Sequence, residues 1–434
     1  METLKTSPRV LIIGAGISGL HAASLLSCQG FDIQIFEAKA QVGGRIRAVH
    51  DLASVPLDIG AQFIHGKKSP HYKIAKEEKM RLKESHTMKT MIEYEGKLRD
   101  YGKVRKMRKC EYIETWEEEW EEEVTEEGED MNMKDFFEGK KQYEGLEHYV
   151  EVDIANEWGT KMERISVKGV KYWDEMFEEY GFEDYIFEEG SNYELIMKRY
   201  KEIISKVKVN APIVNVKENK GKIIVKSEKG EEYEGDFVII AVPVTIIQKK
   251  VIEFEAGMIS EKQWEAINKI EMGSITKVML KFSKAFWPKD VLYIVIKGLV
   301  KCFWVAGLGE KRNVLVGSVS GDEAERIRKI GNEEVIKEIL KDLQRNFGEE
   351  IVGAYEKGVI LDWGKEEYIE AGYTYPGMKE VVGVTRQEAR KAVGGNKVYF
   401  VGEWASVSGK FSSIGAAMES AEAVVEEISK RGKE

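Results

Sequence analysis

The chain has 434 residues, of which 43% are hydrophobic, and its 66 basic and 76 acidic side chains leave a formal net charge of −10. A chain of this size is expected to form two or three domains with a substantial core, and its hydrophobic content excludes a disordered protein. A duplex-binding protein normally has the opposite charge balance, so nucleic acid is not an expected partner.

Short apolar runs predict strands that are buried on both faces of one sheet. The runs are Val10–Ile13, Ile33–Phe36, Phe237–Val242 and Val398–Val401. Helical periodicity follows the first run over Ile17–Cys28 and the last over Ala417–Ile428. The chain therefore begins as β-α-β and ends as β-loop-α, which predicts an α/β fold class.

The middle of the chain has a different character. Lys73–Glu189 is rich in lysine, glutamate and aromatic residues and predicts mostly helix, whereas Lys206–Tyr233 predicts a small β-meander with a turn at Asn219-Lys220-Gly221. Ser260–Trp363 predicts a mixture of helices and strands. Its clearest elements are a helix over Glu333–Phe347 and strands over Lys277–Phe282 and Val314–Val319.

Cysteine spacing and hydropathy exclude several classes of protein. Cys28, Cys110 and Cys302 are scattered and never form CxxC, which argues against a disulfide framework or a zinc site and favours a reducing compartment. The N-terminal stretch does not resemble a signal peptide, and no stretch approaches the roughly 18 apolar residues that span a bilayer. We therefore expect a cytoplasmic protein with no metal site and no transmembrane segment.

One segment carries the acidity of the chain. Glu114–Asp130 holds eleven acidic residues and no basic one, and the rest of the chain is nearly neutral. One interpretation is a solvated helix or loop that Trp116 and Trp120 anchor on one side. The other interpretation is a negatively charged segment that attracts a polycationic substrate or partner.

A dinucleotide-binding motif, made by Gly14, Gly16 and Gly19, leads from the first predicted strand into the first helix. Gly14 permits the tight turn, Gly16 lets the backbone approach a pyrophosphate, and Gly19 allows close helix packing. The helix N-terminus stabilises phosphate charge. Glu37 ends the second strand, where its carboxylate can accept hydrogen bonds from ribose hydroxyls.

A second glycine pair indicates which dinucleotide is bound. Gly43-Gly44-Arg45 follows shortly after Glu37 and supplies another loop that can face phosphate. Two such loops suit a dinucleotide that is bound deep in the protein, which is usual for FAD and unusual for NAD. The sequence therefore favours FAD.

Six segments carry a family resemblance: GAGISGLHAA, FEAKAQVGGR, LDIGAQFIHG, GSITKVMLKF, GYTYPG and VYFVGEWASVSGKFSSIGAAMESA. In this order they resemble flavin-containing amine oxidases, a family that includes monoamine oxidases, polyamine oxidases and histone lysine demethylases. The resemblance covers the chain except about Tyr94–Glu188. It implies a Rossmann-like FAD-binding domain of residues 1–76, 188–258 and 367–434. A substrate domain, with a mixed sheet and helices, would comprise residues 77–187 and 259–366.

The same resemblance implies residues that bind FAD. The glycine motif would hold the pyrophosphate, Glu37 the ribose, the backbone of Ile213 the adenine, and the N–H of Ile414 the flavin C2 carbonyl. The full set of implied cofactor-binding residues is Gly14, Ala15, Gly16, Ser18, Gly19, Glu37, Ala38, Gly44, Arg45, Gly60, Ala61, Gln62, Phe63, Ile213, Trp363, Gly402, Glu403, Ser413 and Ile414.

Some positions depart from the family pattern. Gly372 replaces the cysteine that holds a covalent flavin, so non-covalent FAD is expected. Ser413 replaces the second substrate-facing aromatic of monoamine oxidases, so no two-ring cage is expected. Ala416 and Ala421 stand where the family usually has glycines, which alters the expected packing at the start of the last helix.

Three residues are the candidate catalytic groups. By itself Lys277 is a strand-end lysine of the kind that usually faces solvent, but the resemblance places it at a water-mediated hydrogen bond to flavin N5. Tyr373 would face the substrate beside the flavin, where an aromatic ring also attracts cations. His65 would orient a substrate nitrogen, and a packed histidine without a catalytic role is the alternative.

These features predict an FAD-dependent oxidase that prefers polyamines, yields an imine or aldehyde and passes electrons to O2 to form hydrogen peroxide. The alternatives are an L-amino-acid oxidase or desaturase-type relative, and a flavoprotein that binds without turnover. An amino-acid oxidase needs an arginine for the substrate carboxylate, which the sequence alone does not place. Catalysis by the cofactor explains why no Ser-His-Asp triad or metal cluster stands out.

Overall fold

The computed structural model describes residues 7–108, 128–140, 146–306 and 312–432. Most of the acidic segment Glu114–Asp130, with Trp116 and Trp120, lies outside these residues, as does Cys110. Among the described helices, none combines the length and the apolar character that crossing a membrane requires.

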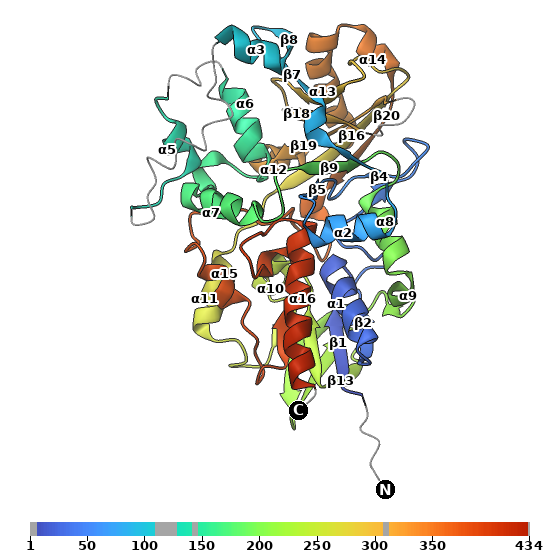
Figure 1. Cartoon of the computed structure of the whole chain (residues 1–434), viewed down its shortest axis with the longest axis vertical. Coiled ribbons are helices and arrows are strands. Elements are labelled where there is room, and N and C mark those ends of the chain that lie inside the picture. The colour runs from blue at the N-terminus through green and yellow to red at the C-terminus, as the bar shows by residue number, and fades with distance from the viewer. Residues whose placement is uncertain (1–6, 109–127, 141–145, 307–311, 433–434) are drawn as a thin grey trace.

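A five-stranded parallel sheet forms the lower half of the molecule in Figure 1. Its order is β10 (Val207–Lys208), β2 (Asp32–Phe36), β1 (Arg9–Ile13), β14 (Phe237–Ile240) and β21 (Val398–Phe400). The strands come from three stretches of the chain, and all four predicted apolar runs belong to this sheet. The predicted α/β class is confirmed.

Both faces of this sheet are covered, as the apolar runs predict. Ile12 packs with helices α1 (Ile17–Cys28) and α16 (Ile414–Arg431), which lie side by side in Figure 1. Leu11 points to the opposite face because side chains alternate along a strand. There it packs with the predicted meander, whose strands are β11 (Ile213–Asn219), β12 (Lys222–Ser227), β13 (Glu232–Gly235) and, added in parallel, β15 (Glu253–Phe254).

Helix α16 begins three residues earlier than the periodicity predicts. Ser413 is its N-cap, and its hydroxyl accepts a hydrogen bond from the backbone N–H of Ala416 at 3.0 Å. The cap, rather than the first apolar residue of the stripe, sets the helix start.

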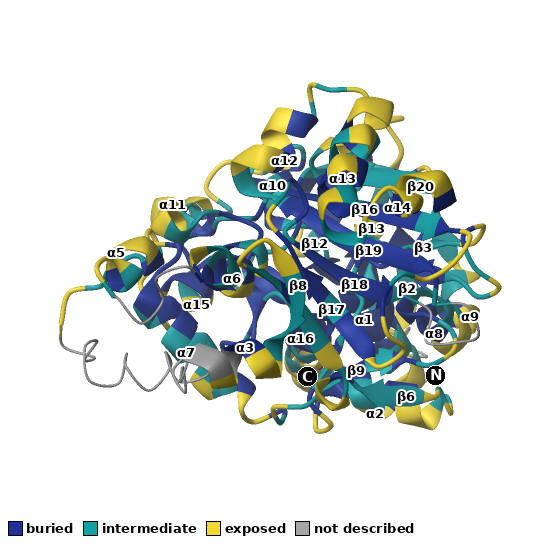
Figure 2. Ribbon diagram, turned by 90° about the horizontal axis from the view of Figure 1, so that it is seen from above, coloured by how far each residue is buried: buried dark blue, intermediate teal, exposed yellow. Residues whose placement is uncertain are grey.

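A seven-stranded mixed sheet forms the upper half. Its order is β20 (Tyr355–Asp362), β16 (Ile275–Phe282), β19 (Val314–Ser320), β18 (Cys302–Ala306), β17 (Val291–Val295), β7 (Lys89–Tyr94) and β8 (Lys97–Asp100). One face packs against α12 (Gly321–Ile327) and α13 (Asn332–Phe347). Figure 2 shows the central strands β18 and β19 as buried and the outer faces of the surrounding helices as exposed, whereas the edge strands β8 and β20 are mostly intermediate.

The prediction that Lys73–Glu189 is mostly helical holds only in part for its described residues, where helices occupy more of the chain than strands but unpredicted strands are also present. Four strands lie there: β6 (Leu82–Glu84), β7, β8 and β9 (Asp184–Phe187). Strand β7 pairs in parallel with β17, about 200 residues away, so tertiary pairing outweighs local helix preference. The described helices are the end of α2 (Pro70–Glu77), α3 (Tyr101–Arg108), α5 (Met133–Phe137), α6 (Glu147–Glu151) and α7 (Val167–Phe177), with a π-helical turn over Val152–Asn156.

Short elements join the two halves. A three-stranded sheet in the order β5 (Ile64–His65), β9, β6 brings His65 opposite Asp184. The remaining described strands and α-helices are β3 (Ala48–Val49), β4 (Leu57–Asp58), α8 (Asn192–Arg199), α9 (Lys201–Ile204), α10 (Val244–Gln248), α11 (Glu261–Lys269), α14 (Glu350–Ala354) and α15 (Thr385–Ala389). Short 3-10 helices lie at Ser85–Thr87, Met162–Arg164, Trp363–Lys365 and Glu403–Ala405.

Candidate active site

The two glycine loops meet at the carboxyl ends of β1 and β2. Gly14 has φ +107°, and a Cβ at this position would lie 2.6 Å from the carbonyl oxygen of Ala241. A Cβ on Gly19 would lie 2.0 Å from the carbonyl oxygen of Gly14, so the helix can approach the strand only with glycine there. Gly16 forms an isolated bridge with Gly43, and a Cβ on Gly44 would lie 3.5 Å from the Cα of Gly16.

Glu37 lies where a ribose is expected. Its carboxylate accepts hydrogen bonds from the backbone N–H groups of Ala15 at 2.9 Å and Lys39 at 3.0 Å, and the oxygens retain further lone pairs. Burial raises the pKa of Glu37, against the lowering effect of these N–H groups. The carbonyl of Glu37 accepts from Ala211 N–H at 3.0 Å, which brings the loop before Ile213 to the same place. Ser18 is buried in the first turn of α1, and Ala38 follows Glu37 directly.

Arg45 and Glu403 form an ion pair next to this loop. Nη1 of Arg45 donates to Glu403 Oε1 at 2.7 Å and to the carbonyl oxygen of Gly372 at 2.8 Å. The Arg45 charge lowers the pKa of Glu403 and, with hydrogen bonds, outweighs the desolvation that would raise it. Gly402 donates its N–H to the hydroxyl of Ser420 in α16 at 2.9 Å.

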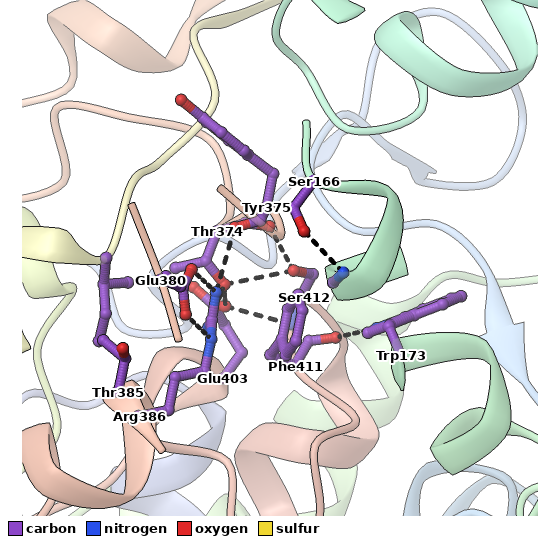
Figure 3. Close-up of polar contacts among 12 residues, drawn as sticks. Ser166, Trp173, Thr374, Tyr375, Glu380, Thr385, Arg386, Glu403, Phe411 and Ser412 are labelled. Carbon is purple, nitrogen blue, oxygen red and sulfur yellow. Dashed lines mark hydrogen bonds and ion pairs between the residues drawn. The ribbon is translucent and has the colours of Figure 1, made fainter. Parts of the chain in front are cut away.

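Figure 3 shows a buried polar network that continues from Glu403. The hydroxyl of Thr374 donates to Glu403 at 2.6 Å and accepts from Arg386 at 2.9 Å. Two parallel bonds, at 2.7 and 2.8 Å, join Arg386 to Glu380, and the Arg386 guanidinium lies 3.7 Å from the ring centroid of Phe411. The sequence contains no sign of this network, because its members lie in separate loops and short helices.

A turn over residues 60–63 links the glycine loops to the upper sheet. A Cβ on Gly60 would lie 2.0 Å from the carbonyl oxygen of Arg45, and the carbonyl of Ala61 accepts from Asn192 Nδ2 at 3.1 Å. Gln62 donates from Nε2 to the carbonyl of Asp58 at 2.9 Å, whereas its Oε1 is buried without a partner among the described residues. Phe63 packs 6.2 Å from Trp304 and 6.3 Å from Tyr293, measured between ring centroids.

Lys277 lies on β16, on the face of the upper sheet that is opposite α13. Its Nζ is 4.2 Å from the ring centroid of Trp304. Poor solvation lowers the pKa of Lys277 to about 8, and the charge of Glu157 only partly offsets this effect. A lysine that changes charge near neutral pH differs from the solvated strand-end lysine that the sequence alone would suggest.

Four side chains form what we call the charged cluster: His65, Glu157, Asp184 and Lys277. Nδ1 of His65 is hydrogen-bonded to Asp184 Oδ1 at 2.7 Å. Glu157 interacts electrostatically with the other three members, and its side chain keeps accessible surface although the surrounding protein leaves it poorly solvated. This desolvation raises the pKa of the Glu157 carboxyl. The hydroxyl of Tyr373 donates to the backbone carbonyl of Glu157, which places the tyrosine beside the cluster.

Trp363 and the start of α16 complete the predicted set. Trp363 is buried and packs with Tyr373 and Ile275, and the guanidinium of Arg47 lies 5.2 Å from its ring centroid. At the start of α16, the Ser413 hydroxyl accepts a hydrogen bond from the backbone N–H of Ala416. The first N–H groups of a helix have no partner within the helix, so the N–H of Ile414 can bind another acceptor. Ala416 and Ala421 are fully buried, so the helix packs closely despite both methyl groups.

The predicted residues thus lie in two connected regions, one around the glycine loops and one around the charged cluster. Ile213 lies near Glu37, at the end of the first region that is farther from the cluster. Sequence reasoning missed Glu157, Asp184, Tyr293, Trp304 and Arg386. The two acidic residues lie in the long stretch rich in glutamate, where nothing distinguishes them from surface residues. Only the alternation of β16 and its neighbours could have indicated that Trp304 and Lys277 share a face.

These residues fit FAD, which the family resemblance implies. A Cβ on Gly16 would meet no protein atom within 4 Å, so space remains where a pyrophosphate would approach the uncapped N-terminus of α1. The buried Oε1 of Gln62 lacks a donor among the described residues, as expected for an atom that faces a bound group. Glu37, the glycine loops and the N-terminus of α16 are the groups that would hold it.

The Lys277→Met variant is expected to slow flavin reduction or reoxidation by more than about tenfold while FAD stays bound, because it removes a positioned proton-holding group. Methionine preserves the chain length and the packing on Trp304. Below a pH of about 8 Lys277 carries a charge, and an inflection near this pH should vanish in the variant. Anaerobic and aerobic stopped-flow absorbance measures both half-reactions. Lys281→Met, on the same strand, is the control, and wild-type rates in Lys277→Met would refute the assignment.

Comparisons with known proteins agree with this geometry. A family model described as flavin containing amine oxidoreductase matches residues 17–429. Polyamine oxidase 2 of Arabidopsis thaliana is 24% identical over 445 residues, which cover 96% of this chain and 87% of that protein. Human lysine-specific histone demethylase 2 is 23% identical over 392 residues, which cover 84% of this chain but only 47% of the demethylase. The solved structure of putrescine oxidase bound to putrescine has a TM-score of 0.78 at 18% identity, with 97% of this chain and 99% of that chain covered.

Proposed function

The chain belongs to the flavin-containing amine oxidoreductases, and from this membership we propose that it oxidises an amine carrying a second cationic nitrogen, a diamine or polyamine. When bound, FAD supplies the acceptor that takes a hydride from the amine carbon and passes the electrons to O2 as hydrogen peroxide. The imine product is hydrolysed to an aldehyde. We include in this proposal non-covalent binding of FAD and a cytoplasmic location.

The charged cluster carries this proposal. Glu157 interacts electrostatically with Lys277, whose lowered pKa leaves part of it uncharged near pH 8. A second carboxylate, Asp184, interacts with Glu157 and with His65. Such a site attracts a dication and repels a substrate carboxylate, which disfavours an L-amino-acid oxidase. Around it, Phe63, Tyr293 and Trp304 offer apolar ring surface for the methylene chain between two nitrogens.

The remaining residues would prepare the amine rather than perform bond chemistry. Tyr373 is held by its hydrogen bond to the Glu157 carbonyl, so its ring is fixed beside the cluster. Burial raises the pKa of the Tyr373 hydroxyl, which therefore stays protonated. Activity should rise with pH as the reacting amine loses its proton.

We also propose that residues 1–76, 188–258 and 367–434 form the FAD-binding domain and that residues 77–187 and 259–366 form the substrate domain. All strands of the parallel sheet fall in the first set, and all strands of the seven-stranded sheet fall in the second. The β5–β9 pairing crosses the boundary beside the charged cluster, so both domains contribute to the substrate side.

A substrate screen tests the proposal. Purified holoenzyme is mixed with putrescine, spermidine, spermine, benzylamine and L-amino acids, and both peroxide release and anaerobic bleaching of the flavin are measured. Bleaching by the diamine or polyamines supports the proposal. Selective bleaching by amino acids would favour the amino-acid oxidase, and no bleaching by any compound would favour a flavoprotein without turnover.

The Glu157→Gln variant is expected to raise KM for putrescine about tenfold, because loss of one ionic contact near a cationic nitrogen costs roughly 1.4 kcal/mol. KM for benzylamine, which has no second cation, should change little. Steady-state peroxide assays at fixed pH measure both values. Glu163→Gln, an exposed acidic residue six positions away, is the control. Equal increases in KM for both amines would show that Glu157 does not bind the second charge of the substrate.

A further inference from the structure

The strand pair β5–β9 places an acidic residue directly against the candidate catalytic histidine. His65 and Asp184 are opposite each other in the antiparallel register, and Nδ1 of His65 lies 2.7 Å from Asp184 Oδ1. Neighbouring bonds hold the pair in place, because Gly66 N–H donates to the Glu183 carbonyl at 2.8 Å and Asp184 N–H donates to His86 at 3.3 Å. The contact is therefore built into the sheet.

The other side of the imidazole remains available. Within residues 7–108, 128–140, 146–306 and 312–432, the His65 ring has one hydrogen-bond partner, Asp184, and the His65 side chain keeps 29% of its surface accessible. Phe177 lies edge-on to the ring at a centroid distance of 5.5 Å, and Phe63 lies at 6.4 Å. These rings limit rotation, while the hydrogen bond to Asp184 keeps the proton on Nδ1.

We propose that Asp184 is a positioning residue that holds His65 with Nε2 free to accept the proton that a substrate ammonium must lose before hydride transfer. This inference rests on the proposed amine oxidation. The proton moves from the substrate nitrogen to Nε2 and then to water, and the amine is left neutral. An aspartate that fixes the tautomer of a proton-accepting histidine is a general device in enzymes.

The charges around His65 support this role. Desolvation alone would lower the pKa of His65, but the negative charge and hydrogen bond of Asp184, with a smaller effect from Glu157, raise it above its usual value. Other titratable groups at the pair are His86, whose ring accepts the Asp184 N–H, Tyr293 of β17, and His71 of α2, which the surrounding protein keeps neutral by lowering its pKa to about 3. Asp184 is thus the main group that makes His65 more basic.

The test compares Asp184→Asn, His65→Gln and the matched control Glu183→Gln, which removes a carboxylate one residue away that pairs with Lys67. The first measurement is a pH titration of 13Cε1-labelled histidine signals by NMR in the oxidised holoenzyme without substrate. The chain has six histidines, and the signal lost in His65→Gln identifies His65. In Asp184→Asn the His65 midpoint should fall by about one pH unit, whereas Glu183→Gln should leave it unchanged.

The second measurement is the pH profile of anaerobic flavin reduction by the best amine. In Asp184→Asn the acidic limb should move to lower pH with the His65 midpoint, and the plateau should fall at least about fivefold because the ring is no longer held. Asp184→Glu keeps the charge, so the acidic limb of its pH profile should lie at the wild-type pH. This variant also tests the proposal if Asp184→Asn does not fold. A uniform drop with an unshifted limb would overturn the proposal.

The two measurements separate this inference from the proposed function. If no amine reduces the wild-type flavin, the proposed function fails, while the NMR titration still reports whether Asp184 controls His65. An unchanged His65 midpoint in Asp184→Asn overturns the inference even if amines are oxidised normally.

Discussion

The Gly16→Ala variant is expected to bind FAD about 10- to 100-fold more weakly while its apoprotein folds normally, because an extra methyl group in a close-packed contact costs about 1–3 kcal/mol. At position 16 the effect of a methyl group on FAD binding can be separated from its effect on folding. A Cβ there would meet no protein atom within 4 Å, and the backbone, with φ −75°, suits alanine. Any loss would therefore arise from contact with the pyrophosphate. Fluorescence titration of apoprotein with FAD measures the affinity, and thermal unfolding of the apoprotein measures the fold.

Two other glycines provide the comparison. Gly19→Ala should impair both folding and binding, since its Cβ would lie 2.0 Å from the carbonyl oxygen of Gly14. Gly353→Ala, in α14 with nothing within 4 Å of its Cβ, should change neither FAD affinity nor the unfolding midpoint. Wild-type affinity in Gly16→Ala would mean that no phosphate approaches this position.

The Glu380→Ala variant is expected to destabilise the protein by about 3–5 kcal/mol, because it leaves a buried guanidinium without its counter-charge. Glu380 and Arg386 each keep only 9% of their side-chain surface accessible. Their pairing is bidentate, and the same arginine donates to Thr374, which contacts Glu403. FAD affinity should therefore fall together with the unfolding midpoint in chemical denaturation.

A double variant and a surface ion pair test whether the unpaired guanidinium causes the destabilisation of Glu380→Ala. Glu380→Leu combined with Arg386→Met removes both charges and should be more stable than Glu380→Ala, since apolar replacement of a buried pair is often nearly neutral. Glu426→Ala removes an exposed partner of Lys430 and should leave the unfolding midpoint nearly unchanged, because solvent screens such a pair. Equal destabilisation in the single and double variants would show that the unpaired charge is not the cause.

The proposed nucleotide site could be assembled from the sequence because its parts are local. The turn at Gly14, the start of α1 and the acid at Glu37 lie within one β-α-β unit, in which backbone geometry dictates the residue types. The same holds for the β-meander and for α13, whose periodicities are strong. The role of Lys277, in contrast, came from resemblance, because a single strand cannot reveal that its lysine packs on Trp304.

The charged cluster could not be predicted in this way. His65 and Asp184 are 119 residues apart, and Asp184 becomes its partner only through the register of β5 and β9. Glu157 is one glutamate among many until the fold sets it beside Lys277. The strands within 73–189 escaped prediction for the same reason, since β7 forms by pairing with a distant strand.

The sequence by itself determined the α/β class, the buried strands and the two glycine loops, because short-range sterics and hydrophobic periodicity decide these features. The tertiary structure decided which charges meet: Asp184 with His65, Glu157 with Lys277, and Glu380 with Arg386. Their interactions depend on distance and desolvation across strands far apart in the chain, and neither quantity exists before the chain is folded.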